Sequence, residues 1–508
     1  MSTRMLLGGH ITHNAKRYPD KVALIDKHGR TTYAELEKAA IKVANALTAQ
    51  GVGRGDKVAF VASASRKWVE AFFGIVKLGA VAVPLNYRET SEQLAMMLDD
   101  CAAKLLFVSS QHVEGFCGLL SSLRIPVVSL DALDAFTADH GPVIDEVDGV
   151  STDDPAVILY TGGTTGRSKG VLLSHANLFW NSLDEIIDTR MVETDNTLIA
   201  TPLHHSAALN CWLLPHLYLG ATATILEKYS TEEVLQTIAA QGVTNTFMPP
   251  SLTREFILHP LSRTLNLQSF KRWYVGSGIL TAHDRQAMKE CIPGVEIFYQ
   301  YGLTEAGPIA TVLKEEDYLK APDSIGKAFI NIEVAIFDDR GQVAAPGEIG
   351  EIVLRGPTVM LGYHNRPDAT AEAIDKDGWL HTGDLAHMDT NGYVFFYDRL
   401  KDMIKTGGLN VYSQEVEAVL SKHPLVREVA VIGLSNERWG EEVTAVIVLK
   451  SGAEPDTDAL IAHARERLAS YQLPKRIEFI AYEQMPFNHN GKILKRELRQ
   501  RFQPANSR

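Results

Sequence analysis

Residues 160–170 carry the groups that a polyphosphate-binding loop needs. The segment reads Tyr-Thr-Gly-Gly-Thr-Thr-Gly-Arg-Ser-Lys-Gly and follows the apolar residues 156–159. Glycines let the backbone approach a ligand and turn N–H groups toward it, while threonine hydroxyls and a lysine add donors and positive charge. We therefore expect phosphate contacts from Thr161, Gly162, Gly163, Thr164, Thr165, Gly166 and Lys169.

The spacing of this loop differs from the Walker pattern, in which lysine directly follows a glycine. Here Gly166 and Lys169 are three positions apart. The alternative interpretation is a surface turn rich in glycine and threonine. The apolar residues before the loop and the length of the run favour a ligand-binding loop.

The composition argues against several classes of function. A formal net charge of -12 over 508 residues argues against nucleic acid as a main partner, because phosphate backbones bind basic faces. The four cysteines form no CxxC pair and lie at no zinc-site spacing, so we expect no disulfide framework or structural zinc and a reducing cytoplasm. The most apolar stretch, residues 211–226, is short and broken by Pro215 and His216, so no transmembrane segment is expected.

Alternating helix and strand patterns must position the loop. Residues 33–47 read as an amphipathic helix with Thr31 or Thr32 as N-cap, and residues 68–78 read as a second helix. Helices and strands in alternation predict βαβ units and largely parallel sheets. The strands predicted in this part are residues 57–62, 80–84, 105–109, 157–160, 222–226 and 272–275.

The pattern changes after Gly326. Residues 334–337, 351–355 and 393–397 read as strands joined by glycine-containing turns without helices between them, which predicts a smaller antiparallel or barrel-like sheet. From about residue 400 the order changes again to a mixture typical of a compact α+β domain. Its predicted elements are helix 413–421 with Ser413 as cap, strands 426–432 and 443–449, helix 457–469 and strand 476–480.

The predicted fold class is therefore α/β with two domains. Residues 1–400 would form a large domain of two parallel-sheet subdomains and a smaller β-barrel-like part. Residues 401–508 would form a small, mobile α+β domain.

Two more motifs follow the loop along the chain. Residues 301–305 read Tyr-Gly-Leu-Thr-Glu, and residues 379–384 read Trp-Leu-His-Thr-Gly-Asp. Together with the loop they resemble, in order, the motifs of the adenylate-forming superfamily. That superfamily includes acyl-CoA synthetases, aryl-CoA ligases, firefly luciferase and peptide-synthetase adenylation domains, and the resemblance extends from residue 160 to residue 492. This chain is most similar to a stand-alone acyl-CoA ligase.

The resemblance implies an ATP site. Tyr301 would stack on adenine, Thr304 would touch the α-phosphate, and Glu305 would hold Mg²⁺, roles that suit a flat ring and a carboxylate. Asp384 would accept the ribose hydroxyls, with Arg399 beside it. The remaining nucleotide contacts implied are Gly276, Ser277 and Gly278 on the other face of adenine, and Gly302.

The resemblance also implies a catalytic lysine and a hinge. Lys492 would bridge the substrate carboxylate and the α-phosphate, where a cation offsets the repulsion of two anions. Lys401 would be the pivot about which the small domain turns between two half-reactions. The implied catalytic set is Lys492, Thr304, Glu305 and His205, whereas Lys495 and Arg496 are interpreted as ordinary charges of a basic helix.

A second implied site takes coenzyme A. Gly407 and Gly408, after Lys405, would line a narrow pantetheine tunnel. Trp439, Lys475 and Arg88 occupy positions where CoA ligases contact the nucleotide end of the cofactor.

The implied acyl pocket has His205 at its gate. His204 and His205 would point apart on a strand, so zinc is not expected. Small residues beside a few apolar ones favour an aromatic or medium-chain acid, and a long chain stays open. The predicted walls are His205, Ser206, Ala207, Phe247, Met248, Gly278, Gly302 and Gly307.

Two positions depart from the pattern of the superfamily. Ser168 stands where proline usually precedes the loop lysine, which frees one backbone angle without removing a donor. Gly278-Ile279 stands where Ala-Pro is frequent, which puts individual adenine contacts in doubt.

The predicted function is an AMP-forming acid–CoA ligase that uses ATP, Mg²⁺ and CoA. One alternative is an adenylating enzyme with another acceptor: a carrier protein, an amine or oxygen. The other is a non-catalytic sensor of acyl-adenylates. Dimers are common in the superfamily, but the sequence does not determine the oligomeric state.

Overall fold

The computed structural model describes residues 5–141, 149–161, 168–487 and 493–503. The chain divides into two compact units, one of residues 1–334 and 353–381 and the other of residues 335–352 and 382–508. The boundary predicted at residue 400 falls inside the second unit, and the division between moving domains stays a prediction. The two units are described separately below.

The first unit contains a nine-stranded sheet. Its central pairs, from β1 with β10 to β12 with β13, are parallel, whereas β2, β14 and β15 add antiparallel edges. The strands, in spatial order, are β15 (Lys327–Ala328), β14 (Ile309–Leu313), β13 (Glu296–Gly302), β12 (Arg272–Gly276), β11 (Asn245–Phe247), β9 (Asn196–Ile199), β10 (Thr222–Ile225), β1 (Val22–Asp26) and β2 (Gly29–Thr32).

A second, seven-stranded sheet completes the parallel core of this unit. Its pairs β3 with β4, β3 with β5, β4 with β7 and β5 with β6 are parallel, and β7 turns back into β8 antiparallel. The order is β18 (Gly362–Tyr363), β8 (Lys169–Ser174), β7 (Pro155–Thr161), β4 (Val81–Pro84), β3 (Lys57–Val61), β5 (Leu105–Val108) and β6 (Val127–Ser129). The predicted largely parallel α/β fold is confirmed.

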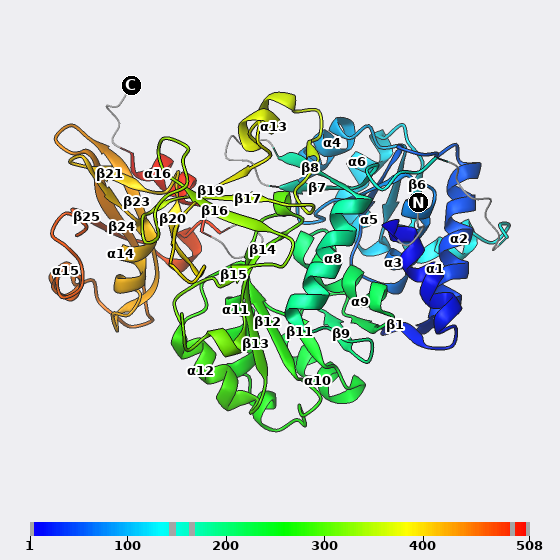
Figure 1. Cartoon of the computed structure of the whole chain (residues 1–508), viewed down its shortest axis with the longest axis horizontal. Coiled ribbons are helices and arrows are strands. Elements are labelled where there is room, and N and C mark those ends of the chain that lie inside the picture. Colours follow the sequence, from blue (N-terminus) through cyan, green and yellow to red (C-terminus); the bar gives the residue numbers. More distant parts are fainter. Residues whose placement is uncertain (1–4, 142–148, 162–167, 488–492, 504–508) are drawn as a thin grey trace. The chain divides into compact units, whose positions relative to one another are not determined.

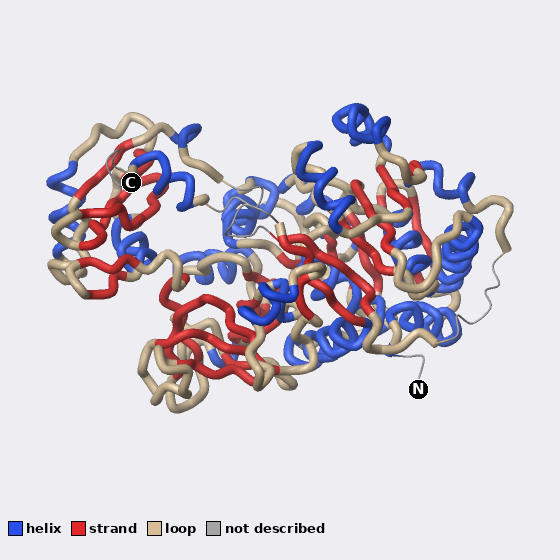
Figure 2. The backbone as a smooth tube through the Cα atoms, turned by 90° about the horizontal axis from the view of Figure 1, so that it is seen from above, coloured by secondary structure: helices blue, strands red, loops and turns tan. Residues whose placement is uncertain are grey.

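Helices cover the faces of these sheets, and α8 and α9 lie between the two sheets (Figure 1). Seen from above, helices flank the strands of this unit on both sides (Figure 2). The helices are α1 (Leu7–Arg17), α2 (Tyr33–Ala49), α3 (Arg66–Lys77), α4 (Ser91–Asp100), α5 (Ser110–Val113), α6 (Cys117–Ser122), α7 (Leu133–Phe136), α8 (His175–Thr189), α9 (Leu214–Leu219), α10 (Thr231–Gln241), α11 (Pro250–Leu258), α12 (Ala282–Cys291) and α13 (Pro367–Ala373).

Local sequence explains the start of α2. The Thr32 hydroxyl accepts a hydrogen bond from the Glu35 amide at 3.3 Å, and the Glu35 carboxylate accepts one from the Thr32 amide at 2.7 Å. This capping box satisfies two backbone donors at the helix terminus. Thr32, one of the two predicted caps, is therefore the N-cap.

Four strands form a smaller sheet in the order β16-β17-β19-β20. They are β16 (Glu333–Phe337), β17 (Gly350–Arg355), β19 (Leu380–Met388) and β20 (Val394–Arg399). The expectation that no helix interrupts these strands is wrong, because α13 lies between β17 and β19 in the chain. Pro367 at the start of α13 suits the first helical turn, where its missing N–H costs nothing.

The second unit contains a five-stranded sheet covered on both faces. Alternating residues of β23 and β24 pack on α14 and α15 with one face and on α16 with the other. The predicted α+β domain is confirmed. Its elements are β21 (Ile404–Thr406), β22 (Leu409–Val411), α14 (Ser413–Leu420), β23 (Val426–Asn436), β24 (Gly440–Leu449), α15 (Thr457–Arg465), β25 (Arg476–Phe479) and α16 (Lys495–Phe502).

Ser413 has a different role from the one predicted. Tyr412 is the N-cap of α14, and Ser413 is its first helical residue. The Ser413 hydroxyl donates instead to the buried carboxylate of Asp398 at 2.6 Å. Tertiary contact, not capping, selects the serine. No described helix is both long and apolar enough to cross a membrane.

Candidate active site

The predicted phosphate loop connects β7 to β8. Thr161 and Lys169 are paired at the ends of this antiparallel pair, and the Thr161 hydroxyl donates to the Lys169 carbonyl at 3.5 Å. The strand pair therefore holds both ends of the loop. The predicted phosphate ligands Gly162, Gly163, Thr164, Thr165 and Gly166 lie outside the described residues.

Lys169 and Glu305 both contact Tyr363. The Lys169 ammonium lies 4.7 Å from the centroid of the Tyr363 ring, and the Tyr363 hydroxyl donates to the Glu305 carboxylate at 2.8 Å. Burial, followed by the charge of Glu305, raises the pKa of Tyr363 well above its ordinary value, so the phenol stays protonated and keeps donating. Tyr363 thus orients the carboxylate predicted to hold the metal.

The residues of the second motif lie where β13 turns into β14. Tyr301 is paired with Thr311, and the Thr304 hydroxyl lies 3.1 Å from the hydroxyl of Ser206. A Cβ atom on Gly302 would lie 1.8 Å from the Pro308 carbonyl oxygen, so this turn admits only glycine. The structure brings a predicted phosphate contact and a predicted acyl-pocket residue into direct contact.

The predicted adenine turn follows β12. Gly276 is paired with Gln300 on β13, and a Cβ atom on Gly276 would lie 2.8 Å from the Gln300 carbonyl oxygen. The Tyr299 hydroxyl donates to the Gly278 carbonyl at 3.0 Å, while Ser277 has a left-handed φ of 62°. Close backbone approach therefore places this turn beside Tyr301 on the neighbouring strand.

The predicted acyl wall is continuous with this strand edge. Phe247 and Met248 are buried, and Trp212 stacks on Phe247 at a centroid distance of 4.5 Å. Trp212 belongs to a π-helix, Ala207–Leu213, that also contains the predicted Ala207. Trp212 was not predicted from the sequence, because a tryptophan within an apolar stretch is typical of an ordinary hydrophobic core.

The two adjacent histidines do not lie on a strand, which corrects the expectation. His204 and His205 occupy a turn, and their ring centroids lie 4.4 Å apart. The Tyr87 ring meets His204 edge-on at 5.1 Å. Within the described residues no group of three or more His, Cys, Asp or Glu side chains could hold a metal ion.

The predicted ribose pair lies in the second unit. Asp384 on β19 is paired with Arg399 on β20, and the Arg399 Nε lies 3.4 Å from an Asp384 carboxylate oxygen. Asp384 is 5% exposed. The two residues predicted to reach the ribose therefore stand side by side on neighbouring strands. The sequence analysis had not placed Asp384 on a strand.

The residue next to the predicted hinge and helix α14 are each joined to α16 by an ion pair. Asp402, next to the predicted pivot Lys401, accepts from Arg499 at 2.8 Å. Lys495 pairs with Glu417 at 2.7 Å and its side chain is 13% exposed. Lys495, which was interpreted as one of the charges of a basic helix, therefore lies on α16 in a largely buried ion pair. Lys492 lies outside the described residues.

Four of the predicted CoA residues meet at the β21–β22 hairpin. Gly407 and Gly408 have left-handed φ angles of 58° and 80°, and the Gly407 amide donates to the Trp439 carbonyl at 2.7 Å. A Cβ atom on Gly407 would lie 3.2 Å from the indole ring of Trp439. Lys405 lies on β21 of the same hairpin.

The other two predicted CoA residues lie elsewhere. Lys475 precedes β25 and donates to the Ser470 carbonyl at 3.3 Å. Arg88 belongs to the first unit, with its guanidinium 5.9 Å from the Tyr87 ring. Their roles stay predictions.

Comparison with known proteins decides the family. The sequence-family model for AMP-binding enzymes matches residues 11–364. The family model for the C-terminal domain of AMP-binding enzymes matches residues 415–492. The chain belongs to the AMP-binding enzyme family.

The similarity to known proteins covers nearly the whole length of this AMP-binding enzyme. A feruloyl-CoA synthase from Amycolatopsis sp is 38% identical over 98% of this chain and 99% of its own length. A 2-succinylbenzoate–CoA ligase from Geobacillus kaustophilus is 35% identical over 95% of both. The crystal structure of ATP-bound MatB from Rhodopseudomonas palustris superposes with a TM-score of 0.89 at 30% identity, covering 97% of this chain and 99% of that one.

These matches confirm the resemblance to adenylate-forming enzymes and the predicted enzyme class. The protein is an ATP-dependent acyl-CoA synthetase. The individual residue roles stay predictions and are taken up below.

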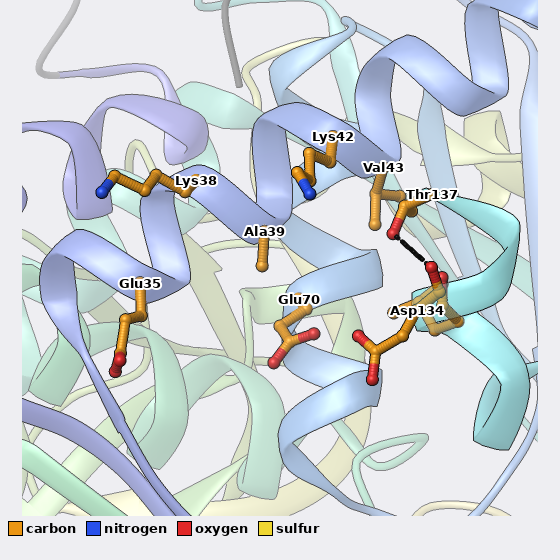
Figure 3. Close-up of a pocket in the computed structure, with 9 residues that line it drawn as sticks. Glu35, Lys38, Ala39, Lys42, Val43, Glu70, Asp134 and Thr137 are labelled. Carbon is orange, nitrogen blue, oxygen red and sulfur yellow. Dashed lines mark hydrogen bonds between the residues drawn. The ribbon is translucent and has the colours of Figure 1, made fainter. Parts of the chain in front are cut away.

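A groove of about 330 Å³ lies apart from these residues, between α2, α3 and the segment around α7 (Figure 3). Lys38 and Lys42 line one side, and Glu70 and Asp134 line the other. No described residue of the predicted ATP, acyl or CoA sites lines it. Its mixed charges indicate a solvated surface groove of this AMP-binding enzyme.

Proposed function

We propose that this AMP-binding enzyme activates an aromatic carboxylic acid as its acyl-adenylate and transfers the acyl group to CoA. The observation that carries the proposal is the 3.1 Å contact between the hydroxyls of Thr304 and Ser206. It joins the motif expected at the α-phosphate to the acyl wall. An acid that binds against Ser206 would present its carboxylate beside the phosphorus that it attacks.

In the first step, a carboxylate oxygen attacks the α-phosphorus of ATP in line, and the bond to the leaving pyrophosphate breaks. Thr304 would donate its hydroxyl hydrogen to an α-phosphate oxygen, and Lys169 would stabilise the leaving charge. Lys492 would lie between the two anions. No protein nucleophile is needed, because positioning and electrostatic stabilisation suffice for phosphoryl chemistry.

Glu305 is the residue that would hold Mg²⁺. Magnesium in nucleotide sites usually takes one or two carboxylates and completes its shell with substrate phosphates and water, so a single oriented carboxylate fits. The hydrogen bond from Tyr363 provides that orientation. The ion would neutralise phosphate charge as pyrophosphate leaves.

In the second step, the CoA thiolate attacks the acyl carbon, the bond from that carbon to the phosphate oxygen breaks, and AMP leaves. We propose that rotation at Lys401 brings the β21–β22 hairpin to the acyl-adenylate. Gly407 and Gly408 have no side chains to block a thin thiol arm, and the Trp439 side chain, 37% exposed, would flank it.

The acyl wall supports an aromatic acid. Trp212 stacks on Phe247, and His205 stands at the predicted gate, so flat rings would surround the predicted acyl pocket. The similar proteins that are named for feruloyl-CoA and 2-succinylbenzoate also act on acids that contain an aromatic ring. We therefore propose a phenylpropenoic or benzoic acid as the substrate class.

Release of pyrophosphate and AMP tests the proposal across benzoic, phenylpropenoic, medium-chain and long-chain acids, with and without CoA. We expect AMP release that needs both CoA and an aromatic acid. Pyrophosphate release that ignores CoA would point to another acceptor. A response confined to aliphatic acids would overturn the substrate class, and silence across the panel would favour an acyl-adenylate sensor.

The proposal includes a cytoplasmic location and a homodimer. Cysteines without disulfide or zinc spacing suit a reducing compartment. Cell fractionation would test the location, and light scattering of the purified protein would test the dimer.

A further inference from the structure

Helix α8 carries a column of buried polar side chains that the proposed chemistry does not use. Asn177, Asn181 and Glu185 follow one another at four-residue spacing, which places them one above another on the same helix face. Their exposures are 7%, 0% and 0%. The helix begins directly after β8, the strand that starts with Lys169. We call these three residues the α8 column.

Asn177 holds the segment behind Glu305. Its amide nitrogen donates to the carbonyls of Pro357 at 2.8 Å and Val359 at 2.9 Å. The next residue, Met360, donates its backbone N–H to the Glu305 carbonyl at 2.9 Å. The first residue of the column therefore supports the backbone at the predicted metal ligand.

Asn181 holds the acyl wall. Its amide nitrogen donates to the backbone carbonyl of Asn210 at 2.8 Å, within the π-helix. The Asn210 amide nitrogen in turn donates to the carbonyl of Gly307 at 3.2 Å. The second residue therefore joins the π-helix to the corner between β13 and β14.

Glu185 holds the adenine edge. Its carboxylate accepts from the side-chain amide of Gln300 at 2.9 Å, and both side chains are buried. Gln300 is paired with Gly276 and immediately precedes Tyr301. The third residue therefore supports the strand that carries the predicted adenine partner.

The surroundings of Glu185 are acidic and apolar. Burial raises the pKa of Glu185 to about 8, while contacts with Cys211 and Gln300 oppose the rise. Asp184 and Asp188 on the same helix add to it. Asp184 accepts from Asn331, and Asp188 pairs with Lys314, so these neighbours engage other segments.

We propose that the α8 column sets the spacing between the metal ligand, the acyl wall and the adenine edge, with Glu185 as the positioning residue for the nucleotide. The proposal rests on the proposed function for what each segment binds. Apolar contacts allow a helix to slide, whereas buried hydrogen bonds are directional and costly to leave unmade. A displacement of α8 along its axis would break all three ties together.

Separate binding and kinetic measurements test the column. Glu185→Leu removes the acceptor of Gln300, and we expect ATP affinity, measured by calorimetry, to fall about tenfold. The KM for the acid should change less than about twofold. Asn181→Leu should show the reverse pattern, with a raised KM for the acid and near-normal ATP affinity.

Two further variants make the test specific. Glu185→Gln keeps an acceptor for Gln300, so its ATP affinity should stay within about twofold of the wild type. Ser182→Ala is the matched control, because this buried hydroxyl donates to the Leu178 carbonyl within α8 itself. It should leave both affinities unchanged.

A purely structural role predicts a different result. Equal losses of ATP affinity and acid KM in Glu185→Leu and Asn181→Leu, in step with lost thermal stability, would overturn the proposal. Unchanged ATP affinity in Glu185→Leu would overturn it as well. If the wild type activates no acid but Glu185→Leu still weakens ATP binding, the proposed reaction fails and the α8 column stands.

Discussion

The predicted ATP and CoA regions are built in different ways. The corner of β13 and β14 is held by partly buried hydrogen bonds, including the one between Ser206 and Thr304 and the one from Tyr363 to Glu305. The β21–β22 hairpin instead depends on two left-handed glycines beside a partly exposed tryptophan. Adenylation needs groups fixed to within fractions of an ångström, whereas acyl transfer needs a surface that can arrive and leave. Separate damage to the two half-reactions would test this contrast.

Lys492→Ala should have the largest effect. We expect adenylate formation to fall by more than about a hundredfold, because the charge between the carboxylate and the α-phosphate is lost. Thioester formation from supplied acyl-adenylate should be nearly intact. Pyrophosphate release and CoA consumption measure the two halves separately, and an equal loss in both would remove the contrast.

Gly407→Ala should damage the opposite half. A side chain at a left-handed φ, 3.2 Å from the Trp439 ring, should slow acyl transfer about tenfold and leave adenylation unchanged. Gly452→Ala is the matched control, since Gly452 has a φ of 80° and nothing within 4 Å of its Cβ position. Slower acyl transfer in the control would assign the effect to backbone strain alone.

Tyr363→Phe should sharpen the role of Glu305. The variant keeps the ring beside Lys169 and removes the hydroxyl that orients the carboxylate, so adenylation should fall about tenfold. The Mg²⁺ concentration for half-maximal rate should rise. A lower rate with an unchanged Mg²⁺ requirement would show that Tyr363 supports the site without positioning the metal.

The smallest effect concerns pH and stability. Folding raises the pKa of Glu185 from 4.5 to about 8, so the unfolded chain loses this proton first. The free energy of unfolding of the wild type should therefore fall as pH rises from about 4.5 to 8. Glu185→Gln has no titratable carboxyl group at this position. The Tm of the variant relative to that of the wild type should therefore rise over the same pH range. A constant difference in Tm would show that Glu185 is ionised in the folded protein.

Much of the fold could be predicted from the sequence. The capping box at Thr32, the apolar strands and the change of pattern after Gly326 are local signals, and the first unit's predicted strands occur where expected. Helix α13 and the assignment of Asp384 to β19 were missed, because both segments are short or polar. Ser413 was interpreted as a cap and Lys495 as one charge of a basic helix, because their contacts with Asp398 and Glu417 come from other elements.

The candidate site divides in the same way. The motifs at residues 160–170, 301–305 and 379–384 indicate the enzyme family. They can be recognised in the sequence because the predicted ligand-binding residues of each motif are close together in the chain. Tyr363 and the α8 column were invisible in the sequence. Tyr363 lies 58 residues from Glu305, and Glu185 lies 115 residues from Gln300.

The sequence by itself determined the family and much of the order of helices and strands, and it predicted the residues that would meet ATP. Those features depend on hydrogen bonds and apolar periodicity within a few residues. Only the tertiary structure decided which side chains hold the ATP and acyl residues in place. Buried polar groups must find partners wherever the fold brings them, and no local pattern encodes that choice.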